Sequence, residues 1–121
     1  MVKALFDTNI LIDFLNGVDE ARIEMDLYQD KAISIITWME VMVGATEQVQ
    51  SATRAFLDGF EIVGLDSPIA DQAVTLRRQH RIKLPDAIIW ASAQETGSLL
   101  VTRNSKDFPV ADPSVRIPYD L

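Results

Sequence analysis

The chain has 121 residues, of which 48% are hydrophobic and 24% are charged, and it carries a net charge of −7. This composition is typical of a single globular domain, and no apolar run approaches the roughly 20 residues that a membrane-spanning helix needs. The absence of cysteine excludes disulfides, thiolate catalysis and cysteine–zinc sites, and a single histidine, His80, leaves little room for histidine-based catalysis. Because residues 1–9 also lack the apolar core of a secretion signal, we expect one cytoplasmic domain over residues 1–121.

Apolar β-branched segments alternate with helical segments along the chain. Strands are predicted at residues 2–6, 32–36, 60–65 and 98–102, with a short edge strand at 114–118. Helices are predicted at residues 8–17, 19–30, 37–48, 50–59, 67–80 and 85–97, the fifth of them opened by a serine cap at Ser67. Apolar strands separated by helices predict an α/β fold in which a mainly parallel sheet of four or five strands is flanked by helices.

Four acidic residues fall where such a sheet binds its ligands, beyond the carboxyl ends of the strands. Asp7 directly follows the first strand, Glu40 lies beyond the second, and Asp107 follows the fourth by a short turn. Asp86 begins a helix whose N-terminus is expected to face the same edge. Gathered carboxylates repel one another, and a divalent cation neutralises them. Oxygen ligands without histidine or thiol suit Mg²⁺ or Mn²⁺, so the sequence predicts such a site at these four acids.

Each of the four acids also has a purely structural interpretation. Thr37 and Glu40 spell Thr-x-x-Glu, the pattern of a capping box in which the glutamate bonds back to the threonine N–H. Asp86 follows a proline and suits the positive end of a helix dipole. Asp7 and Asp107 fit ordinary turn positions. A single site explains why all four acids fall at one sheet edge more simply than four separate structural roles do.

Two further acids, Asp66 and Asp13, fit the site less well, and we expect Asp13 to be exposed or at the rim. Ser34 and Ser92 lie in apolar segments without a partner base and are interpreted as core residues, as are Trp38 and Trp90. With no histidine, cysteine or activated serine available, the remaining chemistry is a water activated by a bound metal ion.

The basic residues are concentrated in one part of the chain. Residues 77–107 contain six bases against three acids, a balance of +3, whereas the remainder has five bases against fifteen acids. A locally basic surface is compatible with phosphate binding, although the run at 77–83 also suits a solvated helix C-terminus. The candidates for contacts with a nucleic-acid backbone are Arg77, Arg78, Arg81, Lys83, Arg103 and Lys106.

Four segments in this order resemble the motifs of PIN-domain ribonucleases, and particularly the VapC-type toxins of toxin–antitoxin pairs. They are FDTNILID, SIITWMEVMVG, LPDAIIWASA and LLVTRNSKDF, and the resemblance covers about residues 2–108. It implies a PIN fold and a Mg²⁺- or Mn²⁺-dependent endoribonuclease that cleaves RNA. It also implies a cytoplasmic homodimer, with no membrane association, and a small antitoxin whose C-terminal segment blocks the cleft.

Matched motif by motif, Asp7, Glu40 and Asp86 fall on the main acidic positions of that family. The resemblance places five neutral residues around them: Thr8, Asn9, Thr37, Thr102 and Asn104. Many family members carry an acid where this chain has Asn104, so the fourth charge has to come from Asp107, three residues later.

Two other classes of protein remain as alternatives. A receiver-type regulatory domain is also a single α/β domain with acids at strand ends, but it needs paired acids after the first strand and a lysine after the last. This chain offers Asp7 alone and Lys106 in a loose position, and Asn9 disfavours phosphatases that begin with an Asp-x-Asp pair. A PIN-like module kept only for binding other proteins would not need intact acids.

Overall fold

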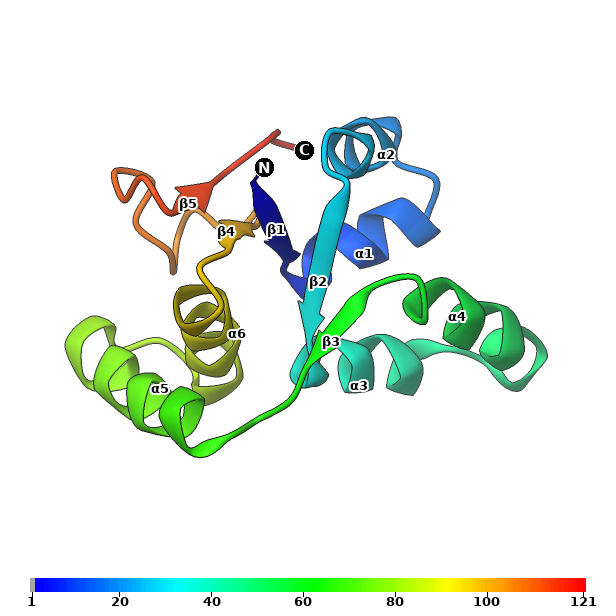
Figure 1. The fold of residues 1–121 in the computed structure, drawn as a ribbon. Helices are drawn as coiled ribbons and strands as arrows, with labels where there is room; N and C mark the ends of the chain where they lie inside the picture. The colour runs from blue at the N-terminus through cyan, green and yellow to red at the C-terminus, as the bar shows by residue number, and fades with distance from the viewer. Residues whose placement is uncertain (1) are drawn as a thin grey trace.

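The fold is a three-layer α/β sandwich around a five-stranded parallel sheet, seen in a computed structural model that describes residues 2–121 (Figure 1). The strands lie in the order β3-β2-β1-β4-β5, and every neighbouring pair is parallel. Their bounds are Lys3–Phe6 (β1), Asp30–Ser34 (β2), Glu61–Val63 (β3), Leu99–Val101 (β4) and Val115–Arg116 (β5). The predicted fold class and the short edge strand are therefore confirmed.

Within residues 2–121, six α-helices connect the strands, and a short 3₁₀ turn, η1 (Glu47–Val49), precedes the fourth. Their bounds are Thr8–Leu15 (α1), Asp19–Asp26 (α2), Ile35–Gly44 (α3), Gln50–Leu57 (α4), Ser67–His80 (α5) and Leu84–Glu95 (α6). Each lies within or close to a predicted helical range. None of the helices within residues 2–121 has the length and apolar character that crossing a membrane requires.

Several predicted boundaries are wrong, among them the end of the second helix, at Asp26 instead of residue 30. Side-chain capping explains two errors at helix starts, one in a boundary and one in the capping residue. The second strand stops at Ser34 instead of residue 36, because the Ser34 hydroxyl accepts a hydrogen bond from the Ile36 N–H at 3.1 Å and starts α3 there. Helix α5 is capped by Asp66, whose carboxylate accepts from the Ile69 N–H at 3.0 Å, and not by Ser67. In both cases a polar side chain satisfies a free N–H of the first helical turn.

The sheet separates two hydrophobic cores. Alternate residues of a strand point to opposite faces, so Ala4 and Phe6 pack with α1, α2, α3 and α4, whereas Leu5 packs with α5 and α6. Trp90 is almost fully buried in the second core, against Phe108, which confirms its predicted packing role. Ser34 and Ser92 are also buried, as predicted. Burial on both faces explains why the inner strands contain consecutive apolar residues, such as residues 4–6 and 99–101.

The strand order fixes where a ligand site can form. Strand β1 lies between β2 and β4, and the connections β1–β2 and β3–β4 lie on opposite faces of the sheet, so a ligand is expected beyond the carboxyl end of β1. We call this end of the sheet the crevice. Phe6 pairs with Val101, and the Asp7 N–H donates to the Val101 carbonyl at 2.9 Å. The first residues beyond β1 and β4 are therefore side by side at this crevice.

Candidate active site

Asp7 lies at the centre of the crevice and is tied to three neighbours. As the N-cap of α1, it accepts a hydrogen bond at Oδ1 from the Thr8 N–H at 2.7 Å. Its Oδ2 accepts from the Thr102 hydroxyl at 2.7 Å and from Asn9 Nδ2 at 3.2 Å. Only 4% of Asp7 is exposed. A turn residue would need only the first of these bonds, so the other two indicate that the carboxylate is held in a defined orientation.

The ionised form of Asp7 is unfavourable despite these three hydrogen-bond donors. Burial raises the pKa of its carboxyl from 3.8 to about 6, against the hydrogen bonds from Thr102 and Thr8, which lower it. The nearby charges of Asp86 and Glu40 raise this pKa further. The residues that the sequence placed on three different segments thus lie within electrostatic range of one another.

Glu40 faces the same crevice, and its position rules out the capping-box interpretation. Helix α3 begins at Ile35 behind the Ser34 cap, so Thr37 is already inside the helix and cannot be its N-cap. Thr37 is fully buried, and the Thr8 hydroxyl is hydrogen-bonded both to it, at 2.9 Å, and to Glu40 Oε1, at 2.6 Å. Glu40 is therefore oriented from α1, across the mouth of the crevice.

Asp86 lies in the first turn of α6, as predicted, but its environment does not favour its charge. Burial raises its pKa, and the charges of Asp107 and Glu40 raise it further, whereas Lys83 lowers it. An acid that served only the helix dipole would have a lowered pKa, because the positive helix end stabilises its ionised form. The helix-start interpretation does not by itself account for Asp86.

The loop after β4 supplies Asp107 by way of Asn104. Asn104 Nδ2 donates to Asp107 Oδ2 at 2.9 Å, and Asn104 Oδ1 accepts from the Asp107 N–H at 3.1 Å. The Asn104 N–H in turn donates to the Thr102 hydroxyl at 3.0 Å. Asn104 is thus the residue that makes the turn, and Asp107 is the charge that it holds near Asp86.

The donor set of the crevice suits a hard divalent cation. It offers carboxylate, amide and hydroxyl oxygens, which Mg²⁺ and Mn²⁺ prefer, and neither thiol nor imidazole. Within residues 2–121, however, no three acidic or histidine side chains converge closely enough to form a ready-made metal cage. The four acids therefore fit a metal by chemistry and by mutual repulsion, and their involvement stays a prediction.

Four of the six basic candidates form one run along the chain, and its last residue, Lys83, lies near Asp86. Arg77, Arg78, Arg81 and Lys83 are exposed at the end of α5 and in the turn that leads into α6. Arg81 adopts the left-handed conformation (φ 56°) that ends α5. Lys106 is also exposed, in the loop after β4.

Arg103 is different, because it is bound to Asp13. Its Nε and Nη2 atoms donate to the two carboxylate oxygens of Asp13 at 2.7 and 2.9 Å, and Tyr119 Oη donates to the same carboxylate at 2.8 Å. Asp13 is 5% exposed, so the expectation that it would be exposed or at the rim is wrong. The partners are 90 and 106 positions apart, and the sequence carries no signal that would pair them.

A family model for the PIN domain matches residues 4–112. The chain belongs to the PIN domain family. The resemblance inferred from the four motifs is thereby confirmed.

Solved structures agree with this assignment. The PIN domain is 48% identical to a chain of a toxin–antitoxin complex from Klebsiella pneumoniae, with a TM-score of 0.93 over 98% of this chain and 100% of that one. VapBC2 from Rickettsia felis, bound to a DNA fragment from its promoter, is 26% identical, with a TM-score of 0.78 over 95% and 96%. FitAcB from Neisseria gonorrhoeae, at 23% identity, shares the fold, with a TM-score of 0.82 over 98% and 99%. No curated protein sequence matches significantly.

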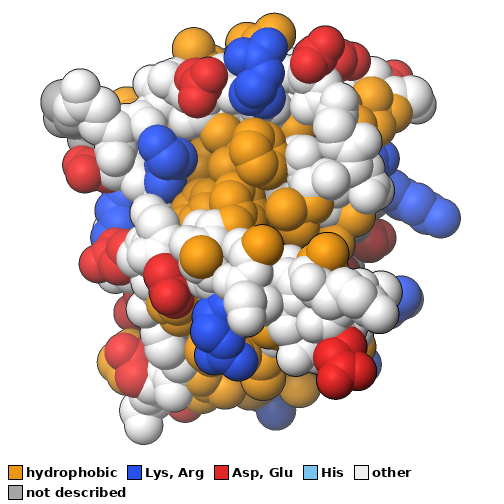
Figure 2. Space-filling model, turned by 90° about the vertical axis from the view of Figure 1, so that its right-hand side faces the viewer, with side chains coloured by type: hydrophobic (Ala, Val, Ile, Leu, Met, Phe, Trp, Pro, Cys, Tyr) orange, Lys and Arg blue, Asp and Glu red, His pale blue; other side chains and the backbone are white. Residues whose placement is uncertain are grey.

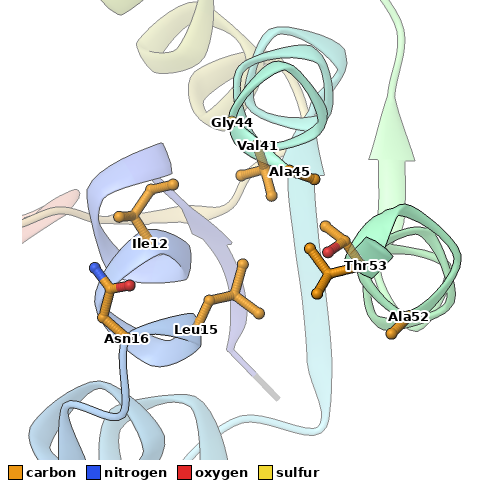
Figure 3. A pocket seen from close by; sticks show the side chains of 9 residues that line it. Ile12, Leu15, Asn16, Val41, Gly44, Ala45, Ala52 and Thr53 are labelled. Carbon is orange, nitrogen blue, oxygen red and sulfur yellow. The ribbon is translucent and has the colours of Figure 1, made fainter. Parts of the chain in front are cut away.

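The PIN domain also has an apolar hollow of about 490 Å³ that is separate from the acids. Figure 2 shows hydrophobic side chains gathered on this face of the molecule, and Figure 3 shows the hollow between α1, α3 and α4. Ile12 and Leu15 form one wall, and Val41, Val49 and the small residues around them form the other. We call this surface the apolar hollow. None of the four acids lines it.

The raised pKa of Asp7 predicts a measurable dependence of stability on pH. Because its folded pKa of about 6 exceeds the unfolded value of 3.8, the native state holds its proton longer, and the unfolding free energy falls as pH rises between these values. Asp7→Asn removes this titration and keeps the helix cap. With metal chelated, the variant should therefore gain stability relative to wild type from pH 4 to pH 7, by roughly 2–3 kcal/mol.

Denaturant unfolding at several pH values measures this difference. Asp112→Asn is the control of opposite sign, because the hydroxyl and N–H of Ser114 lower the pKa of Asp112 and make its ionised form stabilising. A difference between Asp7→Asn and wild type that does not change with pH would contradict the burial of a charged Asp7.

Proposed function

We propose that this PIN domain is an endoribonuclease that depends on Mg²⁺ or Mn²⁺ and acts as the toxin of a toxin–antitoxin pair. The observation that carries the proposal is the gathering of Asp7, Glu40, Asp86 and Asp107 at one crevice, where Asp7 and Asp86 have raised pKa values caused in part by the other acids. Such mutual repulsion destabilises an empty site, and a bound cation removes it. A site that destabilises its own fold is expected to serve function.

The residues of the crevice have two roles in this proposal: some would bind the ion, and others orient the carboxylates that bind it. Asp7, Glu40 and Asp86, with Asp107, would hold the ion, which when bound lowers the pKa of a water molecule and stabilises charge on the phosphodiester. The hydroxyl of Thr102 fixes Asp7, that of Thr8 fixes Glu40, and the amide of Asn104 fixes Asp107. Oriented carboxylates lose little further freedom when they bind, which favours a defined geometry at the phosphate.

An RNA substrate suits the charge around the crevice. Lys83 lies close enough to Asp86 to lower its pKa, so the basic turn from Arg77 to Lys83 leads up to the acids at its Lys83 end. Basic side chains at this position can bind backbone phosphates on either side of the bond to be cleaved, while the acidic remainder of the surface repels them. A receiver-like domain fits less well, because Thr8 and Asn9 stand where its second acid would be.

A protein partner is also part of the proposal. The relative with 48% identity occurs in a toxin–antitoxin complex, and the apolar hollow offers a second chain an exposed hydrophobic surface near the crevice helices α1 and α3. We therefore propose that an antitoxin covers the hollow and blocks the crevice. A cytoplasmic homodimer remains the expectation from the family resemblance.

Glu40→Gln and Asp86→Asn test the metal site directly. Both remove a charge but keep size and hydrogen bonding, so the proposal predicts that both variants fold, with equal or higher stability without metal. They should lose most cleavage and most of the rise in melting temperature that millimolar Mn²⁺ gives the wild type, because a ligand stabilises only the state that binds it.

Incubation with total cellular RNA in Mg²⁺ or Mn²⁺, with a chelated control and mapping of the new ends, measures the activity. Glu47→Gln, in the exposed turn η1, is the matched control for loss of a glutamate charge. Wild-type cleavage by either site variant under limiting metal would remove that acid from the site.

The basic turn is tested by neutralising it as a unit. Glutamine at 77, 78 and 83, with Arg81→Asn to suit the left-handed backbone, should weaken RNA binding and reduce the salt slope by about 0.7 for each phosphate that the variant no longer neutralises. Binding of a single-stranded RNA at several salt concentrations measures the slope. Arg22→Gln, an exposed arginine on α2, is the control. An unchanged salt slope would show that the basic turn does not contact RNA phosphates and is only a solvated helix end.

The apolar hollow is tested by Leu15→Lys, which places a charge on its wall. Leu15 is 44% exposed, so the variant should fold, but burying the lysine against a partner is unfavourable. Affinity for the partner component of the Klebsiella pneumoniae complex, measured by calorimetry, should fall at least tenfold. Val74→Lys, equally exposed (45%) on α5 across the sheet, should not change it. Equal affinities for both variants would exclude the apolar hollow as the surface that the antitoxin covers.

A further inference from the structure

Two buried acids in this domain are held in the same way, by an arginine and a tyrosine. We call them the inner clamp, Asp13 with Arg103 and Tyr119, and the outer clamp, which consists of Glu24, Arg116 and Tyr28. Both join a helix near the N-terminus to a segment near the C-terminus of the chain. Their surroundings differ, because only the inner clamp has its arginine in the loop after β4, between Thr102 and Asn104.

The two clamps are closely matched in geometry. In the inner clamp, two nitrogens of Arg103 lie 2.7 and 2.9 Å from the carboxylate of Asp13, whose side chain is 7% exposed. In the outer clamp, two nitrogens of Arg116 lie 2.5 and 2.9 Å from that of Glu24, whose side chain is 5% exposed. Each tyrosine donates to its acid at 2.8 Å. Bidentate arginine–carboxylate pairs of this kind fix direction as well as distance.

Arg103 stands between the two residues that orient the acids of the crevice. Before it, Thr102 donates to Asp7, and after it, Asn104 binds Asp107 at two points. The Arg103 N–H itself donates to Asn9 Oδ1 at 3.1 Å. A shift of the backbone at residue 103 would therefore move donors to both carboxylates at once. Arg116 of the outer clamp lies in the edge strand β5, where its carbonyl accepts from the Thr102 N–H at 3.1 Å. This bond belongs to the backbone ladder between β4 and β5 and does not involve the Arg116 side chain.

We infer that Asp13, Arg103 and Tyr119 form a positioning device that holds the loop after β4 so that Asp7 and Asp107 face the same ion. This inference rests on the proposed metal-dependent cleavage. The three residues act through Thr102, Asn9 and Asn104 and touch no reacting group. Groups that bond directly to metal ligands are worth about 10–100-fold in metal affinity or activity, and residues one contact further away are expected at the lower end of that range.

This role differs from the phosphate contact expected of Arg103 from sequence. The guanidinium donates through Nε and Nη2 to Asp13, and moving it to a phosphate would leave the buried carboxylate unpaired. A positioning role predicts reduced kcat and Mn²⁺ affinity with unchanged RNA affinity. A phosphate contact predicts the reverse, with a raised KM and a smaller salt slope.

The matched clamps provide the experiment. Arg103→Gln and Tyr119→Phe are compared with Arg116→Gln and Tyr28→Phe, at a temperature where denaturant curves show all four folded. Within each pair the loss of stability should be similar. Mn²⁺ affinity by calorimetry and kcat on a defined RNA should fall about tenfold for Arg103→Gln and less for Tyr119→Phe, and should change less than about threefold in the outer-clamp variants.

Equal effects of the two clamps on Mn²⁺ affinity would overturn the inference, and so would an Arg103→Gln variant that changes only KM. If Arg103→Gln does not fold, Tyr119→Phe decides the same question, because it removes one hydroxyl and preserves packing. A wild-type protein that neither binds Mn²⁺ nor cleaves RNA would overturn the proposed function, and the inference with it. If the wild type binds Mn²⁺ and cleaves RNA, but the inner-clamp and outer-clamp variants have the same effects, only the inference is overturned.

Discussion

The burial of a carboxylate beyond the carboxyl end of the central strand is the constraint on which the rest of the site depends. Asp7 follows the central strand β1, so it cannot turn to solvent without leaving α1 uncapped. Three donors surround it, yet burial and the charges of Asp86 and Glu40 still raise its pKa to about 6. The fold therefore tolerates an unfavourable charge at its centre, and the surrounding hydroxyls and amides serve to orient that charge.

The parallel sheet determines which side chains meet there. Because every strand points the same way, α1 and α3 both begin at the carboxyl edge, and α1 and α6 present positive helix ends to the acids there. These partial charges favour ionised carboxylates but do not offset their burial, since the pKa values of Asp7 and Asp86 remain raised. Protonation or a mobile counter-ion can neutralise these carboxyls, and the proposed metal ion is a counter-ion of this kind.

The sequence predicted those features that follow from local pattern and strand direction. Alternating apolar strands and helices indicated the parallel sheet, and the position of each acid after a strand or at a helix start indicated their common edge. It misplaced the start of α3, because Ile35 and Ile36 continue a β-branched run that the Ser34 cap interrupts. It also missed the buried state of Asp13, because the partner that stabilises its charge is 90 residues away. Long-range polar pairs leave no periodicity in a sequence.

The exchange of an acid for Asn104 has an electrostatic reason in this structure. The Asn104 N–H bonds to the Thr102 hydroxyl, which itself donates to Asp7, so residue 104 is close to the most strained carboxylate of the crevice. A charge there would raise the pKa of Asp7 still further. A neutral amide avoids this repulsion and, by its two bonds to Asp107, holds a charge three residues later, where it acts on Asp86. In the proposed metal site, Asp107 would therefore supply the fourth charge, and Asn104 would orient it.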